Sequence, residues 1–266
     1  MAIIPVSDLH DPRLAPYVSI RERGLMRGHG GQFIVEGKVT LDALIRRSRF
    51  EAESLFLTET RLAPLQYLLE DLDDAVPVYV GEQALMDEVA GFPVHRGVLA
   101  CGKKGKPVEI GTVIAEAQTV LVLLGLSNHD NVGACFRNAA AFGCEAILLD
   151  AGSCDPLYRK AIRVSAGTAL TLPFAHDGTE ADILTQLERS GFDIWCMTPS
   201  ARAVPLHGLN RPDKVAIVLG AEGPGLSNDI LAKGKPVRIS MTEGFDSINV
   251  ATAGAIALSY LYRSPD

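Results

Sequence analysis

The stretch TVLVLLGLSNHDNVGACFRNAAAFGCEAILLD, from Thr119 to Asp150, decides the fold class of this chain. An apolar run at residues 119–126 is followed by polar residues, an alanine-rich segment with helical spacing, Gly143 and a second apolar run at residues 146–150. Uninterrupted apolar runs are typical of strands that are buried on both faces of a parallel sheet. A strand, a helix and another such strand in this order predict a parallel βαβ unit.

The same alternation continues toward the C-terminus. Apolar runs at residues 193–199, 215–222 and 236–241 predict further strands. Helical spacing predicts the intervening helices, at residues 132–142, 157–165, 181–189 and 249–261. We therefore predict an α/β domain over residues 106–266, with a mainly parallel sheet covered on both faces.

A smaller α/β pattern precedes this domain. The runs FIVEG, SLFLT, VPVYV and RGVLACG are strand-like, and KVTLDALIRR has helical spacing. The segment GKKGKP at residues 102–107 is glycine-rich and basic and has no apolar periodicity, so we predict a linker there. Residues 1–105 are enough for one small domain of about 100 residues.

The composition is that of a globular protein with a sizeable core. The chain has 266 residues, of which 47% are hydrophobic and 21% charged. The N-terminal sequence MAIIPVSDLHDPR has neither the basic nor the apolar region of a signal peptide. The longest apolar runs, at residues 121–126 and 251–261, are too short to span a bilayer. We expect a cytoplasmic protein without a membrane segment.

The five cysteines do not suggest a structural or catalytic centre. Their number is odd and no C-x-x-C pair occurs, which disfavours a disulfide framework and a zinc site. Cys135 and Cys144 have apolar neighbours, where a free cysteine usually behaves as a small hydrophobic residue. We expect no metal site.

The charge distribution matters more than the net charge of −7, which alone argues mildly against nucleic acid. Between Arg13 and Arg49 there are eight Lys or Arg residues and three acids, and residues 96–106 hold four basic residues and no acid. On charge alone, a mixed solvated surface and a nucleic-acid contact both remain open.

Polar residues stand where the predicted strands end, at the position where α/β proteins form a ligand crevice. In the first such segment, NVGACFRNAAAFG at residues 131–143, Arg137 lies one to two turns inside the predicted helix. A largely buried helix requires a partner or a ligand for an arginine, although the side chain can also extend to solvent along its apolar stem. The spacing leaves both interpretations open.

The second segment, IVLGAEGPGLS at residues 217–227, ends a strand at Gly220. Glycines allow the backbone to approach a ligand closely. The segment matches neither the dinucleotide-binding fingerprint nor a P-loop, which disfavours an ordinary nucleotide-binding enzyme. Glu222, at the strand end, either orients a partner group or lies exposed on a tight turn.

The third segment, ISMTEGFDSINVATAGAIALSYLY, covers residues 239–262. Ser247 and Asn249 precede a helix of small residues and are good capping residues. The small residues allow close approach to another element, and the apolar positions predict a buried or interface helix.

Together, and in this order, the three segments resemble the motifs of the SpoU/TrmH-type RNA 2′-O-ribose methyltransferases of the SPOUT superfamily. The likeness is carried by Asn131, Gly133 and Arg137, then by Gly220, Glu222 and Gly223, and finally by Ile239, Met241, Ser247 and Asn249. It extends over residues 119–262 and includes VSAGTALTLPF at residues 164–174. The stretch FIVEGKVTLDALI resembles part of the L30e-like RNA-binding domain that often precedes the methyltransferase domain.

Two departures from the family pattern are small. Ile248 stands where leucine is common, and Ala221 stands where a polar residue is common. The first conserves size and polarity, whereas the second changes fine positioning at most.

The resemblance implies a fold, a cofactor and partners. It implies S-adenosylmethionine as the methyl donor, rRNA or tRNA as the substrate, and a homodimer with the site near the subunit interface. It also implies a trefoil knot in the C-terminal part of the domain, which no periodicity argument can show.

The resemblance also assigns roles to residues. The catalytic residues it implies are Arg137, Glu222, Ser247 and Asn249. The cofactor-binding residues it implies are Leu219, Gly220, Ile239, Met241 and Ile248. A guanidinium is a poor base near neutral pH, so Arg137 is also interpreted as a phosphate and oxyanion ligand. With RNA as the substrate, the candidate RNA contacts are Asn131, Arg21, Arg23, Arg27, Lys38, Arg46, Lys103 and Lys104, with Arg47 and Lys106 beside them.

Two further alternatives stay open. A catalytically silent RNA-binding relative would keep the fold, but the four implied catalytic residues are all present. A SPOUT enzyme that methylates a base nitrogen is disfavoured by Arg137, because base-methylating relatives have differently arranged motifs.

Overall fold

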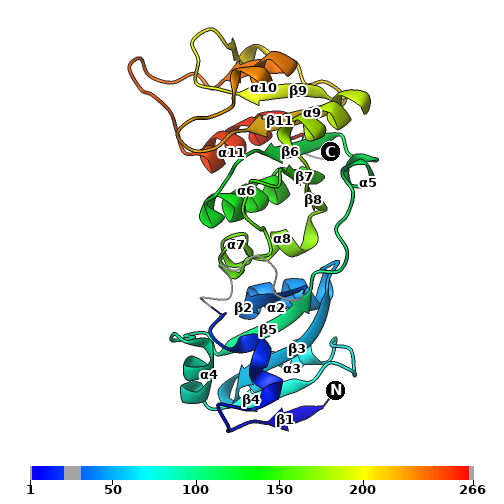
Figure 1. The fold of residues 1–266 in the computed structure, drawn as a ribbon, viewed down its shortest axis with the longest axis vertical. Helices are drawn as coiled ribbons and strands as arrows, with labels where there is room; N and C mark the ends of the chain where they lie inside the picture. Colours follow the sequence, from blue (N-terminus) through cyan, green and yellow to red (C-terminus); the bar gives the residue numbers. More distant parts are fainter. Residues whose placement is uncertain (1, 21–30, 264–266) are drawn as a thin grey trace. The chain divides into compact units, whose positions relative to one another are not determined.

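The computed structural model describes residues 2–20 and 31–263, which form two compact units (Figure 1). The first unit comprises Met1–Lys106 and Leu157–Thr171, and the second comprises Pro107–Pro156 and Leu172–Asp266. The segment Leu157–Thr171 therefore packs with the N-terminal unit, although the sequence prediction placed it within residues 106–266.

The first unit is built on a five-stranded mixed sheet with the order β1-β4-β3-β5-β2. Strands β1 and β3 run parallel to β4, whereas β5 runs antiparallel to both of its neighbours. The strands are β1 (Ile3–Pro5), β2 (Gln32–Glu36), β3 (Glu51–Thr58), β4 (Val78–Gly81) and β5 (Val98–Lys103). The helices are η1 (Pro12–Tyr17), α2 (Lys38–Arg46), α3 (Glu59–Leu69), α4 (Gln83–Ala90), α7 (Arg159–Val164) and α8 (Thr168–Thr171).

The predicted linker at residues 102–107 was wrong at its first two residues. Gly102 and Lys103 belong to β5, and Gly102 pairs with Phe33 of β2. A Cβ atom at Gly102 would lie 2.4 Å from the Phe33 ring, so the glycine makes room for this ring in the sheet. This packing role cannot be distinguished from a linker glycine by composition alone.

The second unit confirms the predicted parallel sheet. It has seven strands in the order β10-β12-β9-β11-β6-β7-β8, and every neighbouring pair runs parallel. The strands are β6 (Thr119–Leu123), β7 (Ala146–Leu149), β8 (Phe174–His176), β9 (Asp193–Met197), β10 (Val204–Pro205), β11 (Val215–Leu219) and β12 (Lys235–Arg238). The helices are α5 (Ile110–Ile114), α6 (His129–Ala141), α9 (Glu180–Arg189), η2 (Leu206–Gly208), α10 (Asn228–Lys233) and α11 (Val250–Leu261).

Helices cover both faces of this sheet, which explains the uninterrupted apolar strands. On one face, Val120 and Val122 of β6 share a core with Leu187 of α9. On the other face, α11 lies so close to β11 that a Cβ atom at Gly254 would be 2.9 Å from Leu219 Cδ1. Both alternating side-chain sets of a strand are therefore buried. No helix among residues 2–20 and 31–263 is long and apolar enough to cross a membrane.

Candidate functional site

The first and second polar segments meet at the carboxyl edge of the parallel sheet. Strands β6 and β11 pair in register and end together at Leu123 and Leu219. Beyond this pair, the Leu124 N–H donates to the Leu219 carbonyl at 2.9 Å. Gly125 adopts φ +68°, and a Cβ atom there would lie 3.3 Å from the Ala221 Cβ atom. The loops after the two strands are thus in direct contact.

The second segment folds into a tight turn at this edge. A Cβ atom at Gly220 would lie 2.5 Å from the Gly225 carbonyl carbon, which only glycine permits. The Gly225 N–H donates to the Ala221 carbonyl at 3.0 Å and closes the turn. Gly223 adopts φ +89°, and Glu222 is exposed on the turn. The loop therefore presents backbone and a free carboxylate outside the sheet edge.

The third segment begins α11 with an asparagine cap. The Asn249 side-chain oxygen accepts from the N–H groups of Ala251 and Thr252, at 2.9 and 3.2 Å. At the first segment, Asn128 caps α6 by accepting from the Asp130 N–H at 2.9 Å. Each cap satisfies N–H groups that lack a partner within the helix.

Two side-chain amides join the first segment to the third. Asn249 Nδ2 donates to Asn131 Oδ1 at 3.0 Å, although the residues are 118 positions apart. Asn138 Nδ2 donates to the Ala251 carbonyl at 2.9 Å. Asn131 is only 7% exposed, so its amide is positioned to orient Asn249. The N-terminal end of α11, red in Figure 1, is therefore joined to α6, green in the same view, at two points along α6.

Replacing Asn249 with alanine is expected to lower the free energy of unfolding by about 1–3 kcal/mol. The variant loses the helix cap and leaves the buried Asn131 oxygen without its donor. Asn249→Ser keeps a capping hydroxyl and should recover part of the loss. Urea denaturation measures both effects, and wild-type stability of Asn249→Ala would contradict this role for the amide.

The other implied catalytic residues are exposed and separate. Arg137 on α6, Glu222 on the turn and Ser247 before α11 all face solvent. Within the described part of the chain, their side chains form no hydrogen bond or ion pair with one another or with Asn249. Exposure of Arg137 agrees with a side chain that reaches out of the helix, and it leaves the guanidinium available to a ligand.

The implied cofactor-binding residues lie in the loops after β11 and β12 and before α11. Leu219 is buried, whereas Gly220, Ile239, Met241 and Ile248 are half-buried. They offer backbone groups and apolar side chains but no charge. Among residues 2–20 and 31–263, no group of three or more His, Cys, Asp or Glu side chains is arranged to hold a metal ion.

The cysteines near this site belong to the core. All five cysteines are free. Burial raises the pKa of both the Cys135 and the Cys144 thiols to about 12. Because the thiolate is the nucleophile, both residues are chemically inert near neutral pH.

Asp150 is a positioning residue that sequence reasoning missed. Its carboxylate accepts from the Gly125 N–H at 2.8 Å, the Gly152 N–H at 3.0 Å and the Ser153 hydroxyl at 2.6 Å. It is 7% exposed, so these bonds join the loop between β6 and α6 to the loop after β7 from within. The available signal was its place directly after a buried strand, the same signal that singled out Glu222.

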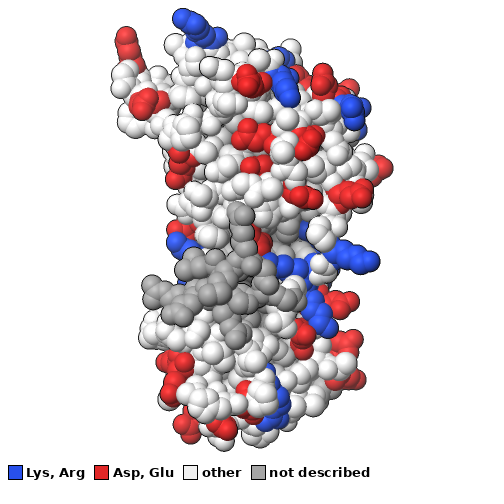
Figure 2. Space-filling view, viewed as in Figure 1, with Lys and Arg blue, Asp and Glu red and all other residues white. Residues whose placement is uncertain are grey.

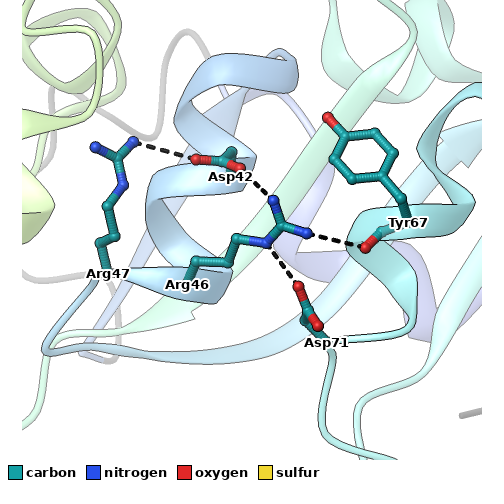
Figure 3. A network of polar contacts seen from close by, with 5 residues as sticks. All are labelled: Asp42, Arg46, Arg47, Tyr67 and Asp71. Carbon is teal, nitrogen blue, oxygen red and sulfur yellow. Dashed lines mark hydrogen bonds and ion pairs between the residues drawn. The ribbon is translucent and has the colours of Figure 1, made fainter.

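Arg46, a candidate RNA contact, is engaged within the protein (Figure 3). Its guanidinium donates to Asp71 at 2.6 Å, to Asp42 at 3.2 Å and to the Tyr67 carbonyl at 3.1 Å. Arg47 also pairs with Asp42, at 3.2 Å. These partners tie α2 to α3 and engage all three nitrogens of the Arg46 guanidinium, whereas the Arg47 side chain remains 59% exposed.

The remaining candidate RNA contacts differ in their availability. Lys38 is exposed, with its ammonium 5.1 Å from the centre of the Tyr67 ring. Lys103 lies 4.0 Å from Glu53, and Lys104 is half-buried. Lys106 is exposed, whereas Arg21, Arg23 and Arg27 lie outside the described residues. The face drawn in Figure 2 carries acidic side chains over both units, with lysines and arginines among them.

Comparison with known proteins agrees with this geometry. An uncharacterized tRNA/rRNA methyltransferase of Mycobacterium tuberculosis is 38% identical over 267 residues, or 97% of this chain and 91% of the relative. The 23S rRNA (guanosine-2′-O-)-methyltransferase RlmB of Salmonella typhimurium is 26% identical over 236 residues, or 85% of this chain and 96% of that protein.

The fold is also found among solved structures. The AdoMet-bound rRNA methyltransferase from Sinorhizobium meliloti has a TM-score of 0.82 to this chain at 18% identity, with 97% of both chains covered. The model of the SpoU rRNA Methylase family matches residues 118–259, which include the first two polar segments and all but the last three residues of the third. On this match and on the mycobacterial relative, the chain belongs to the SpoU rRNA methylase family.

Proposed function

We propose that this protein transfers a methyl group from S-adenosylmethionine to a ribose 2′-hydroxyl of rRNA or tRNA. The observation that carries the proposal is the convergence of the three segments. Gly125 touches Ala221, Asn249 binds Asn131, and α11 packs on Leu219. Membership of the SpoU family supports the reaction class, and the name of the RlmB relative supports ribose as the acceptor.

The residues at the sheet edge fit the cofactor. Gly220, Gly223 and Gly225 leave three positions of the turn without a side chain beside its backbone. Leu219, Ile239, Met241 and Ile248 supply apolar surface beside it, as an adenosyl group requires. S-adenosylmethionine, when bound, supplies an activated methyl group, so the site needs no metal. The contribution of the protein is mainly positioning.

Arg137 has the central chemical role in this proposal. Its exposed guanidinium binds the phosphate beside the target ribose and stabilises negative charge as the 2′-hydroxyl loses its proton. Asn249 holds the start of α11 against α6 through its hydrogen bond to Asn131. This contact keeps α6, which carries Arg137, in place. In this proposal, Glu222 and Ser247 lie in the loops beside the ribose that accepts the methyl group.

The finer structural features belong to the same proposal. They are an L30e-like RNA-binding domain over residues 1–105, a methyltransferase domain over residues 106–266 with a C-terminal trefoil knot, a homodimer, and a cytoplasmic location beside the RNA substrates. Exposed Ile256 and Tyr260 on α11 support a dimer contact, because both present apolar surface to solvent.

Mass analysis of nucleosides from the rRNA and tRNA of a deletion strain, compared with its parent, tests the reaction. We expect one 2′-O-methylated nucleoside to disappear, and the RNA class that loses it identifies the substrate. Transfer of isotopically labelled methyl groups by the purified protein should then fail on RNA with a deoxyribose at that position. Undiminished transfer to the deoxy substrate would show base methylation instead.

A further inference from the structure

Two arginines contact one buried carboxylate in the first unit, and a third covers the residue that follows it. Glu36, at the end of β2, is 7% exposed and forms an ion pair with Arg159 of α7. Arg163, one helical turn further along α7, places Nη1 at 3.8 Å from the same Glu36 oxygen. The third is Arg96, whose side chain covers Gly37. A Cβ atom at that glycine would lie 2.8 Å from Arg96 Cδ and 3.0 Å from Nη1.

The carboxylate does not balance these charges. Within the part of the chain that the structure describes, the Arg96 side chain has no hydrogen bond or ion pair, and the Arg163 side chain has only the long contact with Glu36. Arg96, Arg159 and Arg163, called the arginine cluster below, therefore carry more positive charge than Glu36 offsets. The network of Figure 3 differs, because its two arginines face two aspartates and a carbonyl group.

Arg159 makes the cluster a rigid one. Its side chain is 12% exposed, and its guanidinium lies 4.4 Å from the centre of the Phe92 ring. Its Nε atom is buried and has no hydrogen-bond partner among residues 2–20 and 31–263. A guanidinium in this setting loses hydration that one carboxylate does not fully replace. A second anion would compensate this loss, and a planar guanidinium suits a phosphate group.

The position of α7 within the first unit is fixed by two further contacts of the residues that follow it. Gly167, just after α7, packs so closely on α2 that a Cβ atom there would lie 2.7 Å from the Ala43 Cβ atom. The Arg49 N–H also donates to the Leu170 carbonyl at 3.3 Å. The two α7 arginines are thus held beside Glu36 before any ligand binds.

We propose that the arginine cluster binds backbone phosphates of the RNA substrate. The proposal rests on the proposed function and deepens it, because it assigns RNA contacts to a segment that interrupts the second unit in sequence. Phosphate contacts contribute affinity and position the RNA without reading its bases. The cluster therefore anchors the RNA, while Arg137 acts at the acceptor ribose.

The test compares RNA affinity over a range of salt concentrations. The double variant Arg96→Ala/Arg163→Ala leaves the buried Glu36–Arg159 pair intact, so we expect normal thermal stability. Filter binding with bulk rRNA and bulk tRNA should show an affinity at least about tenfold lower at low salt. The slope of log affinity against log salt should become shallower by about one for each arginine lost.

A matched control removes the same charge elsewhere. Arg13→Ala/Arg189→Ala also deletes two exposed arginines, of which Arg13 pairs with Asp11. Its salt slope should equal that of the wild type. A wild-type slope and affinity in Arg96→Ala/Arg163→Ala would overturn the role of the cluster, even if methyl transfer is normal. Failure of the wild type to methylate any RNA would instead contradict the proposed function.

Discussion

Replacing Arg137 with alanine is expected to reduce methyl transfer by at least about 100-fold, the usual effect of removing one group that stabilises developing negative charge. Binding of S-adenosylmethionine should be unchanged, because the implied cofactor residues lie in other loops. Stability should also be unchanged, since Arg137 is exposed and has no side-chain partner among the described residues. Single-turnover transfer, calorimetric cofactor binding and thermal unfolding measure the three properties.

The conservative variant Arg137→Lys separates charge from geometry. Lysine keeps the positive charge but lacks the planar fork that binds a phosphate at two points. We expect transfer by Arg137→Lys to fall between the rates of the wild type and Arg137→Ala. Near-normal transfer by Arg137→Ala would refute the assignment of this residue, whereas equal loss in both variants would show that the fork itself is required.

The sequence predicted the second unit well because its strands are long, apolar and regularly spaced. The runs at residues 119–126 and 215–222 became β6 and β11, at the centre of the sheet. The strands that were missed are the short ones. Strand β8 has three residues and β10 has two, which is too few for a hydrophobic period to emerge.

Contacts between distant residues were not predictable in the same way. The helix starts at Asn128 and Asn249 follow from local capping chemistry, and Asn249 was among the capping candidates. The bond from Asn249 to Asn131, and the pairing of Glu36 with Arg159, span more than 100 positions. No local rule relates such residues.

Arginine and lysine counts located an excess of basic residues in the N-terminal region but not which of their side chains are available to a ligand. Arg46 and Lys103 were candidates on charge alone, yet each has an acidic neighbour in the fold. Arg159 and Arg163 were overlooked, although their four-residue spacing on α7 places them on one helix face. The charge of a side chain therefore indicates an RNA contact only when its ion-pair partners within the protein are known.

Gly220→Ala is the second substitution with a large expected effect, because its new Cβ atom would meet backbone rather than a flexible side chain. That atom would lie 2.5 Å from the Gly225 carbonyl carbon and 2.6 Å from the Leu226 nitrogen. The turn must open, which moves Glu222 and the backbone that we propose contacts the cofactor. We expect a loss of about 1–3 kcal/mol in the free energy of unfolding. Misplacement of the loop by about 1 Å should lower turnover about 100-fold.

Alanine substitutions at two other glycines serve as controls for this prediction. A Cβ atom at Gly208 meets nothing within 4 Å, so Gly208→Ala should behave as the wild type. At Gly254 the nearest atom is the end of the Leu219 side chain, at 2.9 Å, which can move, so Gly254→Ala should have an intermediate effect. Cofactor affinity by calorimetry should therefore decrease in the order Gly208→Ala, Gly254→Ala, Gly220→Ala. If Gly220→Ala binds S-adenosylmethionine as tightly as Gly208→Ala does, the turn is not part of the cofactor site, because a displaced loop cannot preserve contacts made through its own backbone.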